Sequence, residues 1–304
     1  MVSRTLAVVG PTAAGKTALA IGLAQRLGGE IVSADSRQVY RSMDIGTAKP
    51  TAAEQKAARH WLIDVAAPGE GFTLATYVDL ARAAIDDIHG RGRTAIICGG
   101  TGQYVWALLE RWEVPRVAPD RELRAHLEGV AATSGVDALI AELRAVDPAS
   151  AERLDARNVR RVIRAIEVTR ATGTPFSDWQ RRGHSDEATP VIGLSMPREA
   201  LYNRIDQRVD AMFAAGFVDE VRHLIQQGCA CDLPAMSGIG YRQVCEHLQR
   251  AVPLADAVAR VKTESHRLAR MQRAWFREDD PRIHWIDATA ADTLEQACAV
   301  AQSS

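Results

Sequence analysis

The sequence predicts an α/β protein in which helices cover a parallel sheet and a helical insertion interrupts the core. Three observations support this fold class. Short apolar runs alternate with helix-like stretches, the first run leads into a glycine-rich loop, and residues 115–188 show helical patterns alone. The chain has 304 residues, 47% of them hydrophobic, so it can bury a large core. We therefore expect a core formed by residues 1–114 and 189–304 around the insertion.

The glycine-rich loop follows the apolar run Leu6–Val9 and precedes a helix-like stretch over Ala18–Leu27. It has the spacing G-x-x-x-x-G-K-[ST], and its residues are Gly10, Pro11, Thr12, Ala13, Ala14, Gly15, Lys16 and Thr17. In such a loop, backbone N–H groups converge on a phosphate, the lysine reaches its outer oxygens, and the threonine hydroxyl can hold Mg²⁺. The following helix adds positive charge at its N-terminus. A P-loop NTPase-like core that binds a di- or triphosphate is therefore predicted.

The remaining elements continue the alternation of strand and helix. Further strands are predicted over Glu30–Ala34, Trp61–Val65, Thr94–Cys98, Thr189–Leu194 and Arg282–Ile286. Helices are predicted over Thr73–His89, Gln103–Leu109, Arg198–Gln227, Tyr241–Gln249, Leu254–Arg277 and Thr293–Ala301. This order is typical of a doubly wound parallel sheet.

Two polar residues follow strands near the loop. Asp35 comes directly after the second strand, and Thr101 lies in the Gly99–Gly102 turn after Cys98. The carboxyl ends of parallel strands form the ligand crevice of such sheets, so both side chains are candidates for the site. Either could instead be an ordinary turn or capping residue. Phosphoryl-transfer enzymes usually place an acid after another strand, and none follows Cys98, which leaves Asp35 as the most evident carboxylate.

Arginines are clustered in two stripes. Arg153, Arg157, Arg160, Arg161 and Arg164 are spaced to share one helix face, and Arg260, Arg267, Arg270 and Arg277 form a second such set. A solvated, ion-paired surface would explain them, since Glu152, Asp155 and Glu167 lie near the first. The net charge is only −1, so any nucleic-acid surface must be local. Two basic stripes favour a polyanion partner.

Cysteine usage and hydropathy suggest the compartment. The five cysteines are an odd number without framework spacing, so we expect reduced thiols. Cys229 and Cys231 lie near His223, but zinc normally needs four well-spaced ligands. No apolar run of about 18 residues occurs, and the N-terminus leads straight into the loop, so neither a signal peptide nor a membrane span is expected. We expect a cytoplasmic monomer.

Taken together, these motifs resemble the bacterial tRNA dimethylallyltransferases, also called isopentenyltransferases. The resemblance spans almost the whole chain. It rests on the loop at 10–17, DSRQVY at 35–40, MDIGTAKP at 43–50, GGTGQY at 99–104, NVRRVIRAIEV at 158–168, RIDQR at 204–208, IGYR at 239–242 and QRAWFR at 272–277. The aspartate motif followed at this distance by DIGTAKP is the most specific part.

The resemblance implies transfer of a dimethylallyl group from dimethylallyl diphosphate to N6 of the adenosine 3′ to the anticodon, position 37, in tRNAs that read codons beginning with U. Lys16, Thr17 and the loop would hold the diphosphate and Mg²⁺, with Arg208 added to the clamp. Asp35 would accept the N6 proton and Thr101 would bind near the amine. The implied tRNA contacts are Asp35, Ser36, Arg37, Gln38, Val159, Arg160, Arg161, Val162, Ile163, Ser237, Gly238, Ile239, Gly240, Tyr241, Arg242, Arg270, Gln272, Arg273, Trp275 and Arg277.

The sequence departs from the family pattern at a few positions. Ala14 replaces a frequent serine, and Met271 and Ala274 lack the polar groups usual there, which affects individual RNA contacts. Two other functions remain open on the residues alone. A small-molecule kinase could use ATP on the same loop, although it would need a metal-supporting acid. An RNA-binding module could grip a phosphate without chemistry, although an unpaired Asp35 would repel a polyanion.

Overall fold

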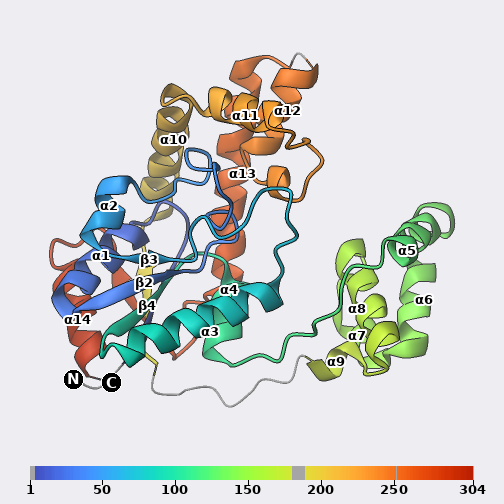
Figure 1. Ribbon diagram of the computed structural model, residues 1–304, viewed down its shortest axis with the longest axis horizontal. Coiled ribbons are helices and arrows are strands. Elements are labelled where there is room, and N and C mark those ends of the chain that lie inside the picture. The colour runs from blue at the N-terminus through green and yellow to red at the C-terminus, as the bar shows by residue number, and fades with distance from the viewer. Residues whose placement is uncertain (1–3, 180–188, 251, 304) are drawn as a thin grey trace. The chain divides into compact units, whose positions relative to one another are not determined.

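The computed structural model describes residues 4–179, 189–250 and 252–303. The chain divides into two compact units, Met1–Leu109 with Asp186–Ser304, and Glu110–Ser185. The second unit therefore starts and ends slightly earlier than the 115–188 that the sequence predicts. Figure 1 shows both units and labels most of their helices and some of the strands. Among the described residues, no helix is long and apolar enough to cross a membrane.

The first unit is built on one parallel sheet of six strands. The strands are β1 (Thr5–Val9), β2 (Gly29–Ser33), β3 (His60–Trp61), β4 (Thr94–Cys98), β5 (Val191–Ser195) and β6 (Ile283–Asp287). Their order in the sheet is β3-β2-β4-β1-β5-β6, and every pair is parallel. Each strand must therefore return through a crossover connection, which confirms the predicted alternation.

One predicted strand is much shorter than expected. The apolar run Trp61–Val65 contributes only the two-residue β3, His60–Trp61, to the sheet. Leu62 and Asp64 adopt φ angles of 63° and 59°, in the left-handed region, so the extended conformation cannot continue. Val65 is exposed rather than buried in a sheet. The hydrophobic pattern alone therefore predicts a strand at a place where the backbone turns.

Helices cover both faces of the sheet. The first unit contains α1 (Lys16–Leu27), α2 (Ala52–Ala57), α3 (Leu74–Gly90), α4 (Gly102–Leu109), α10 (Arg198–Ala214), α11 (Phe217–Gln226), α12 (Tyr241–Arg250), α13 (Leu254–Trp275) and α14 (Thr293–Gln302). The helix α1 packs on β1, β2, β4 and α14, whereas α3 packs on β2, β4 and α4.

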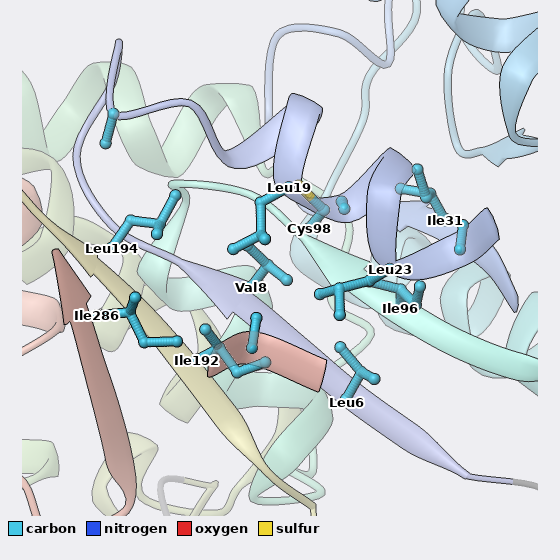
Figure 2. Close-up of a cluster of buried hydrophobic side chains, with 14 of the residues drawn as sticks. Leu6, Val8, Leu19, Leu23, Ile31, Ile96, Cys98, Ile192, Leu194 and Ile286 are labelled. Atoms are coloured by element: carbon cyan, nitrogen blue, oxygen red, sulfur yellow. The ribbon is translucent and has the colours of Figure 1, made fainter. Parts of the chain in front are cut away.

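Alternate strand residues form the core on the α1 face. Leu6 and Val8 of β1 and Ile96 of β4 are buried there against Leu19 and Leu23 of α1. Figure 2 shows these side chains meeting between the helix and the strands. Because successive strand residues point to opposite faces, the residues between them support the α3 side. The sheet is thus buried on both faces, as its near-continuous apolar strands predict.

A second core lies among the helices that follow the sheet. Phe217 and Val221 of α11 pack with Tyr241 and Val244 of α12 and with Met43 of the loop after β2. The long helix α13 packs on α10 and α12 and then contacts α4. It therefore extends from this helical cluster to the turn that follows β4.

The second unit is entirely helical in its described residues. Its helices are α5 (Arg121–Ser134), α6 (Val136–Val146), α7 (Pro148–Arg153), α8 (Val159–Thr172) and α9 (Phe176–Trp179). Leu127, Leu139, Leu143, Val162 and Ile166 form its core. This agrees with the helical patterns expected there.

The first arginine stripe does not lie on one helix face. Arg153 ends α7 and Arg157 lies in the following turn, before α8 begins. Arg157 pairs with Asp155, and Arg164 pairs with the buried Glu167. Only Arg160 and Arg161 remain as exposed arginines in the first turn of α8. The arginine spacing alone did not predict that the chain breaks between the two helices, where Asp155 and Asn158 lie.

The cysteine expectation is wrong for two residues. Cys231 and Cys245 form a disulfide, and Cys98, Cys229 and Cys298 are free. The two bonded cysteines come from the loop after α11 and from α12. They are 14 residues apart in sequence, and no framework spacing marks them as a pair.

Candidate active site

Three loops meet at the carboxyl edge of the sheet because their strands are neighbours. The strand β4 lies between β2 and β1, so the segments that begin at Asp35, Gly99 and Gly10 leave adjacent strands at the same edge. The backbone confirms their proximity. Ala34 donates its N–H to the Cys98 carbonyl over 2.8 Å, and Gly99 donates to the Val8 carbonyl over 3.2 Å. The crevice predicted from the sequence is therefore present.

The phosphate loop has the backbone that its glycines allow. Gly10 has φ 137°, and a side chain there would place its Cβ 2.8 Å from the Leu194 carbonyl oxygen. Gly15 has φ 95° and precedes the first turn of α1, which begins at Lys16. The N–H groups of the loop thus lie beside the N-terminus of a twelve-residue helix.

Lys16 lies against this loop and is strongly perturbed. Its Nζ donates a hydrogen bond to the Pro11 carbonyl over 2.7 Å. Burial, assisted by the nearby positive Arg208, lowers the pKa of Lys16 to about 8, although Cys98 and Asp35 act in the opposite direction. A buried ammonium without a counter-ion is costly, so this group favours an anionic ligand.

Arg208 reaches the loop from α10. Its Nη1 lies 3.5 Å from Oγ1 of Thr12 and can donate to it. Burial lowers the pKa of this guanidinium, while Asp35 partly counteracts the effect. The structure therefore places two half-buried cations, Lys16 and Arg208, beside the loop that the sequence predicts to bind a diphosphate.

Asp35 has a structural role that leaves part of its carboxylate available. Its Oδ1 accepts hydrogen bonds from the N–H groups of Arg37 (2.8 Å) and Gln38 (3.4 Å), so it does stabilise a turn. Its Oδ2 accepts none within the described part of the chain. Oδ1 thus stabilises the turn, and Oδ2 of the same side chain is available for the catalytic role that the sequence analysis expects.

Thr101 joins the turn after β4 to the turn after β2. Its Oγ1 accepts a hydrogen bond from the Ser36 N–H over 3.0 Å, and its own N–H donates to the Ala34 carbonyl over 3.1 Å. The hydroxyl therefore lies next to the residue that follows Asp35. This is the proximity that sequence analysis expected of the two polar groups.

Two cavities border these groups. The loop-side cavity, about 1120 Å³, is lined by Lys16 and Thr17 among others, and the helix-side cavity, about 450 Å³, is lined by Thr101, Met271 and Trp275 among others. Seven residues line both: Thr12, Asp35, Gly100, Arg208, Met212, Leu268 and Gln272. Asp35 is thus accessible from the phosphate loop on one side and from α13 on the other.

Two residues after β2 that are expected to contact tRNA have side chains bonded within the protein. Arg37 donates from Nη1 to the Pro234 carbonyl over 2.8 Å, and its Nη2 lies 3.4 Å from Oγ of Ser237. Gln38 donates from Nε2 to the carbonyl oxygens of Thr47 and Ala48. These side chains hold neighbouring loops in place, a role that the sequence did not suggest.

Other expected RNA contacts are buried. Val162 and Ile163 belong to the core of the second unit, so their side chains offer no surface to an RNA. Tyr241 is 1% exposed and bonded to Glu220, and Gln272 is 8% exposed. The exposed members of the expected set are Arg160, Arg161, Ser237, Arg242, Arg270, Arg273, Trp275 and Arg277. The first two belong to the second unit, and the other six belong to the first.

Glu220 and Lys49 shape the site although sequence analysis passed over their roles. The Glu220 carboxylate accepts the backbone N–H groups of Asp44 (2.9 Å) and Ile45 (2.6 Å). The buried Lys49 ammonium binds Asp64 over 2.6 Å and also pairs with Asp44. Both groups anchor the DIGTAKP loop that lines the loop-side cavity. The DIGTAKP motif, which contains Lys49, was the signal available in the sequence. Glu220, which binds the backbone of this motif, lies outside it.

The site suits a Mg²⁺ ion bound mainly through a ligand. Within the described residues, no group of three or more His, Cys, Asp or Glu side chains could hold a metal. The Thr17 hydroxyl lines the loop-side cavity and has no hydrogen bond to other described residues. Mg²⁺ commonly takes few protein ligands and completes its shell with phosphate oxygens and water, so one hydroxyl beside a phosphate loop fits it.

Known proteins resemble this chain along its whole length. A family model described as IPP transferase matches residues 38–279. A tRNA dimethylallyltransferase of Roseiflexus sp. (strain RS-1) is 52% identical, with 97% of this chain and 96% of that protein covered. The crystal structure of the full-length tRNA isopentenylpyrophosphate transferase from Bacillus halodurans is 38% identical, with a TM-score of 0.71 and coverage of 99% and 97%.

A eukaryotic dimethylallyltransferase acting on tRNA is 27% identical in its solved structure, with a TM-score of 0.82 and coverage of 99% of this chain and 79% of that one. The fold, the P-loop and the sequence thus agree with one group of proteins. The family model spans most of the chain, and relatives about half identical in sequence cover nearly all of it, so this chain belongs to the IPP transferase family.

Proposed function

We propose that this protein transfers a dimethylallyl group from dimethylallyl diphosphate to N6 of adenosine 37, next to the anticodon, in tRNAs that read codons beginning with U. Membership of the family and the names of its relatives support the reaction class. One observation carries the mechanism: Asp35 lines both cavities, one beside the phosphate loop and one beside α13. A base at this position can serve two substrates that enter from different sides.

The diphosphate binds at the loop-side cavity. The Lys16 ammonium and the Arg208 guanidinium neutralise the charge that grows on the leaving group as the allylic C–O bond breaks. Thr17 would hold Mg²⁺, which supplies further charge stabilisation for the diphosphate oxygens. Because both cations are partly withdrawn from solvent, their effect is stronger than it would be in bulk water.

The adenine binds at the helix-side cavity. Its N6 lone pair is delocalised into the ring, so a base that accepts the N6 proton assists attack. The free Oδ2 of Asp35 takes that proton while the new N6–C bond forms and pyrophosphate leaves. Thr101 orients the amine from the adjacent turn. The target base must leave its stack to enter the cavity.

Each unit presents its own exposed arginines to the phosphate backbone of the RNA. Arg270 and Arg273 lie on α13 in the first unit, and Arg160 and Arg161 lie on α8 in the second. Exposed Trp275 offers a face for stacking a base. We further propose a cytoplasmic monomer, as the sequence analysis expects.

A P-loop kinase is the competing function, and the comparisons do not favour it. The turn after β4 carries Gly99, Gly100 and Thr101 rather than the acid that a kinase would use to support its metal. The distinguishing experiment incubates the protein with Mg²⁺, dimethylallyl diphosphate and tRNA that lacks the modification. Digestion and mass spectrometry should find a prenylated adenosine only at position 37.

Substitution of Asp35 tests whether this residue acts as the general base. Asp35→Asn keeps an oxygen for the turn and removes the base, so kcat should fall by about 10²- to 10⁴-fold while tRNA still binds. ATP consumption on a small-molecule acceptor without a prenylated product would overturn the proposal. Full transfer by Asp35→Asn would overturn the role of the base alone.

A further inference from the structure

Gln272 connects two catalytic loops from the buried side of α13. Its Oε1 accepts the N–H of Thr12 over 2.8 Å, and its Nε2 donates to the carbonyl of Gly100 over 3.0 Å. The side chain is 8% exposed. Both ends of the amide are therefore occupied within the protein, one by the phosphate loop and the other by the turn that carries Thr101.

The packing around this amide leaves little room for adjustment. A Cβ at Gly100 would lie 2.2 Å from Nε2 of Gln272, so only glycine allows the contact. One helical turn further on, Trp275 packs on Gly102, where a Cβ would come within 2.3 Å of the indole. The Trp275 carbonyl also accepts the Trp106 indole N–H over 2.9 Å. The end of α13 is thus seated on the turn after β4.

We propose that Gln272 is a positioning residue that fixes the phosphate loop relative to the Thr101 turn. This inference rests on the proposed function, because it concerns the geometry between diphosphate and acceptor amine. The position requires one acceptor and one donor at the same time, which a carboxamide supplies. The direct tRNA contact that the sequence analysis expects of Gln272 is the alternative that the test below distinguishes.

The proposed effect on catalysis follows from what each loop holds. Thr12 also carries the contact to Arg208, and Thr101 bonds to Ser36 beside Asp35. Loss of the amide therefore loosens the diphosphate clamp and the base with respect to each other. Misplacement of reacting groups by about 1 Å can cost about 100-fold in rate.

The test compares Gln272→Met, which keeps the side-chain length and loses both hydrogen bonds, with Gln25→Met on the exposed surface of α1. We measure kcat, KM for tRNA, thermal midpoint and the calorimetric Kd of Mg²⁺–pyrophosphate. For Gln272→Met, kcat should fall about 10- to 100-fold and the pyrophosphate Kd should rise about three- to tenfold. KM for tRNA and all values for Gln25→Met should stay within twofold of the wild type.

Two results would overturn the positioning role. A raised KM for tRNA with unchanged kcat and pyrophosphate Kd would show an RNA contact instead. Wild-type kinetics and wild-type pyrophosphate binding in Gln272→Met would show that the amide has no role in the reaction, whatever its thermal midpoint. Pyrophosphate binding is measured without prenyl transfer, so failure of the proposed function in the wild type is seen separately.

Gln272→Glu provides a readout that a purely structural role would not move. The ionised carboxylate accepts from Thr12 but cannot donate to Gly100, whereas the protonated carboxyl does both. The ratio of variant to wild-type kcat should therefore rise as pH falls, because acid restores the missing donor. Asp35, Lys16 and Arg208 line the same cavity in both proteins, so the ratio removes the pH dependence that the two proteins share. A ratio that stays flat from pH 7 down to pH 4, the range in which a glutamic acid side chain takes up its proton, would contradict the proposal.

Discussion

Tyr241 donates its phenolic hydrogen bond to Glu220 over 2.6 Å, from a side chain that is only 1% exposed. Burial and the neighbouring Glu220 carboxylate raise the pKa of Tyr241, so its hydroxyl stays protonated and remains a donor. The same carboxylate accepts the backbone N–H groups of Asp44 and Ile45. The pair thus ties α11 and α12 to the loop that lines the loop-side cavity.

Replacement of Glu220 by Gln should destabilise the protein and release this loop. Hydrogen bonds to a charged group contribute about 1.5–3 kcal/mol, and Gln leaves fewer acceptors for the four donors, which are the N–H groups of Asp44, Ile45 and Gly46 and the Tyr241 hydroxyl. We expect the free energy of unfolding to fall by about 2 kcal/mol in urea titrations. For Tyr241→Phe, which leaves the carboxylate bonded to the backbone, we expect about 1 kcal/mol.

The double variant tests whether the two residues act together. If they do, the combined loss will be smaller than the sum of the single losses, because the second change removes a bond that is already broken. Additive losses would mean that each side chain stabilises the fold independently.

The affinity for dimethylallyl diphosphate should depend on the protonation of Lys16. Burial lowers the pKa of this ammonium to about 8 in the free protein, and a bound diphosphate favours the charged form. Below pH 8 the ammonium is already present and the Kd should be constant. Above pH 8 binding must take up a proton, so the Kd should rise about tenfold per pH unit.

Calorimetry in buffers of different ionisation enthalpy measures the proton uptake directly. Lys16→Arg keeps its charge throughout this range, so its Kd should show no such rise between pH 7 and pH 9.5. A wild-type Kd that stays constant over the same interval would contradict the assigned pKa.

Local signals predicted what lies close together in sequence. The strand–loop–helix around Lys16 follows from the four fixed residues of the loop spacing and an apolar run, and Asp35 and Thr101 follow from their positions after strands. Gln272 is 260 residues from Thr12 and 172 from Gly100 in the sequence, so the residues next to it in the chain give no sign of these two hydrogen bonds. Only tertiary packing shows that this glutamine, and not another in the chain, bonds to both loops.

Burial explains the remaining differences. Val162 and Ile163 lie inside a motif associated with RNA, but helical periodicity directs them into the core of the second unit while Arg160 and Arg161 point outward. A motif identifies a segment as a whole and does not separate the residues that hold it in place from those that touch a ligand.

Glu30 should make the fold sensitive to acid. This buried carboxylate is held by Arg91, whose hydrogen bond is the main cause of a pKa lowered to about 2, with further bonds from Trp61 and Arg93. A lowered carboxyl pKa adds stability that is present above about pH 4.5 and is lost as pH falls towards 2. The full difference corresponds to about 3 kcal/mol.

Chemical unfolding at pH 3 to 7 measures this loss. Glu30→Gln should be less stable than the wild type by about 2–3 kcal/mol at pH 7, and the gap should narrow by about 1 kcal/mol per pH unit below 4.5. A gap that is independent of pH would show that the carboxylate charge contributes nothing to folding.

The disulfide between Cys231 and Cys245 should stabilise the segment that receives Arg37. Pro234 and Ala235 accept hydrogen bonds from Arg37 and lie inside the chain loop that the disulfide closes. The cross-link restricts the unfolded chain, and a loop of about 15 residues corresponds to about 3 kcal/mol in the chain-entropy model. We therefore expect phosphine reductants to lower the free energy of unfolding by about that amount.

A double variant separates reduction of this bond from other effects of the reagent. Cys231→Ser with Cys245→Ser lacks the cross-link, so its unfolding should be the same with and without reductant, whereas Cys229→Ser should respond as the wild type does. The segment should also become more accessible, because reduction frees one anchor while Arg37 retains the other. Faster proteolytic cleavage between residues 229 and 238 of the reduced wild type would show this, and an unchanged cleavage rate together with unchanged unfolding would mean that Arg37 alone fixes the segment.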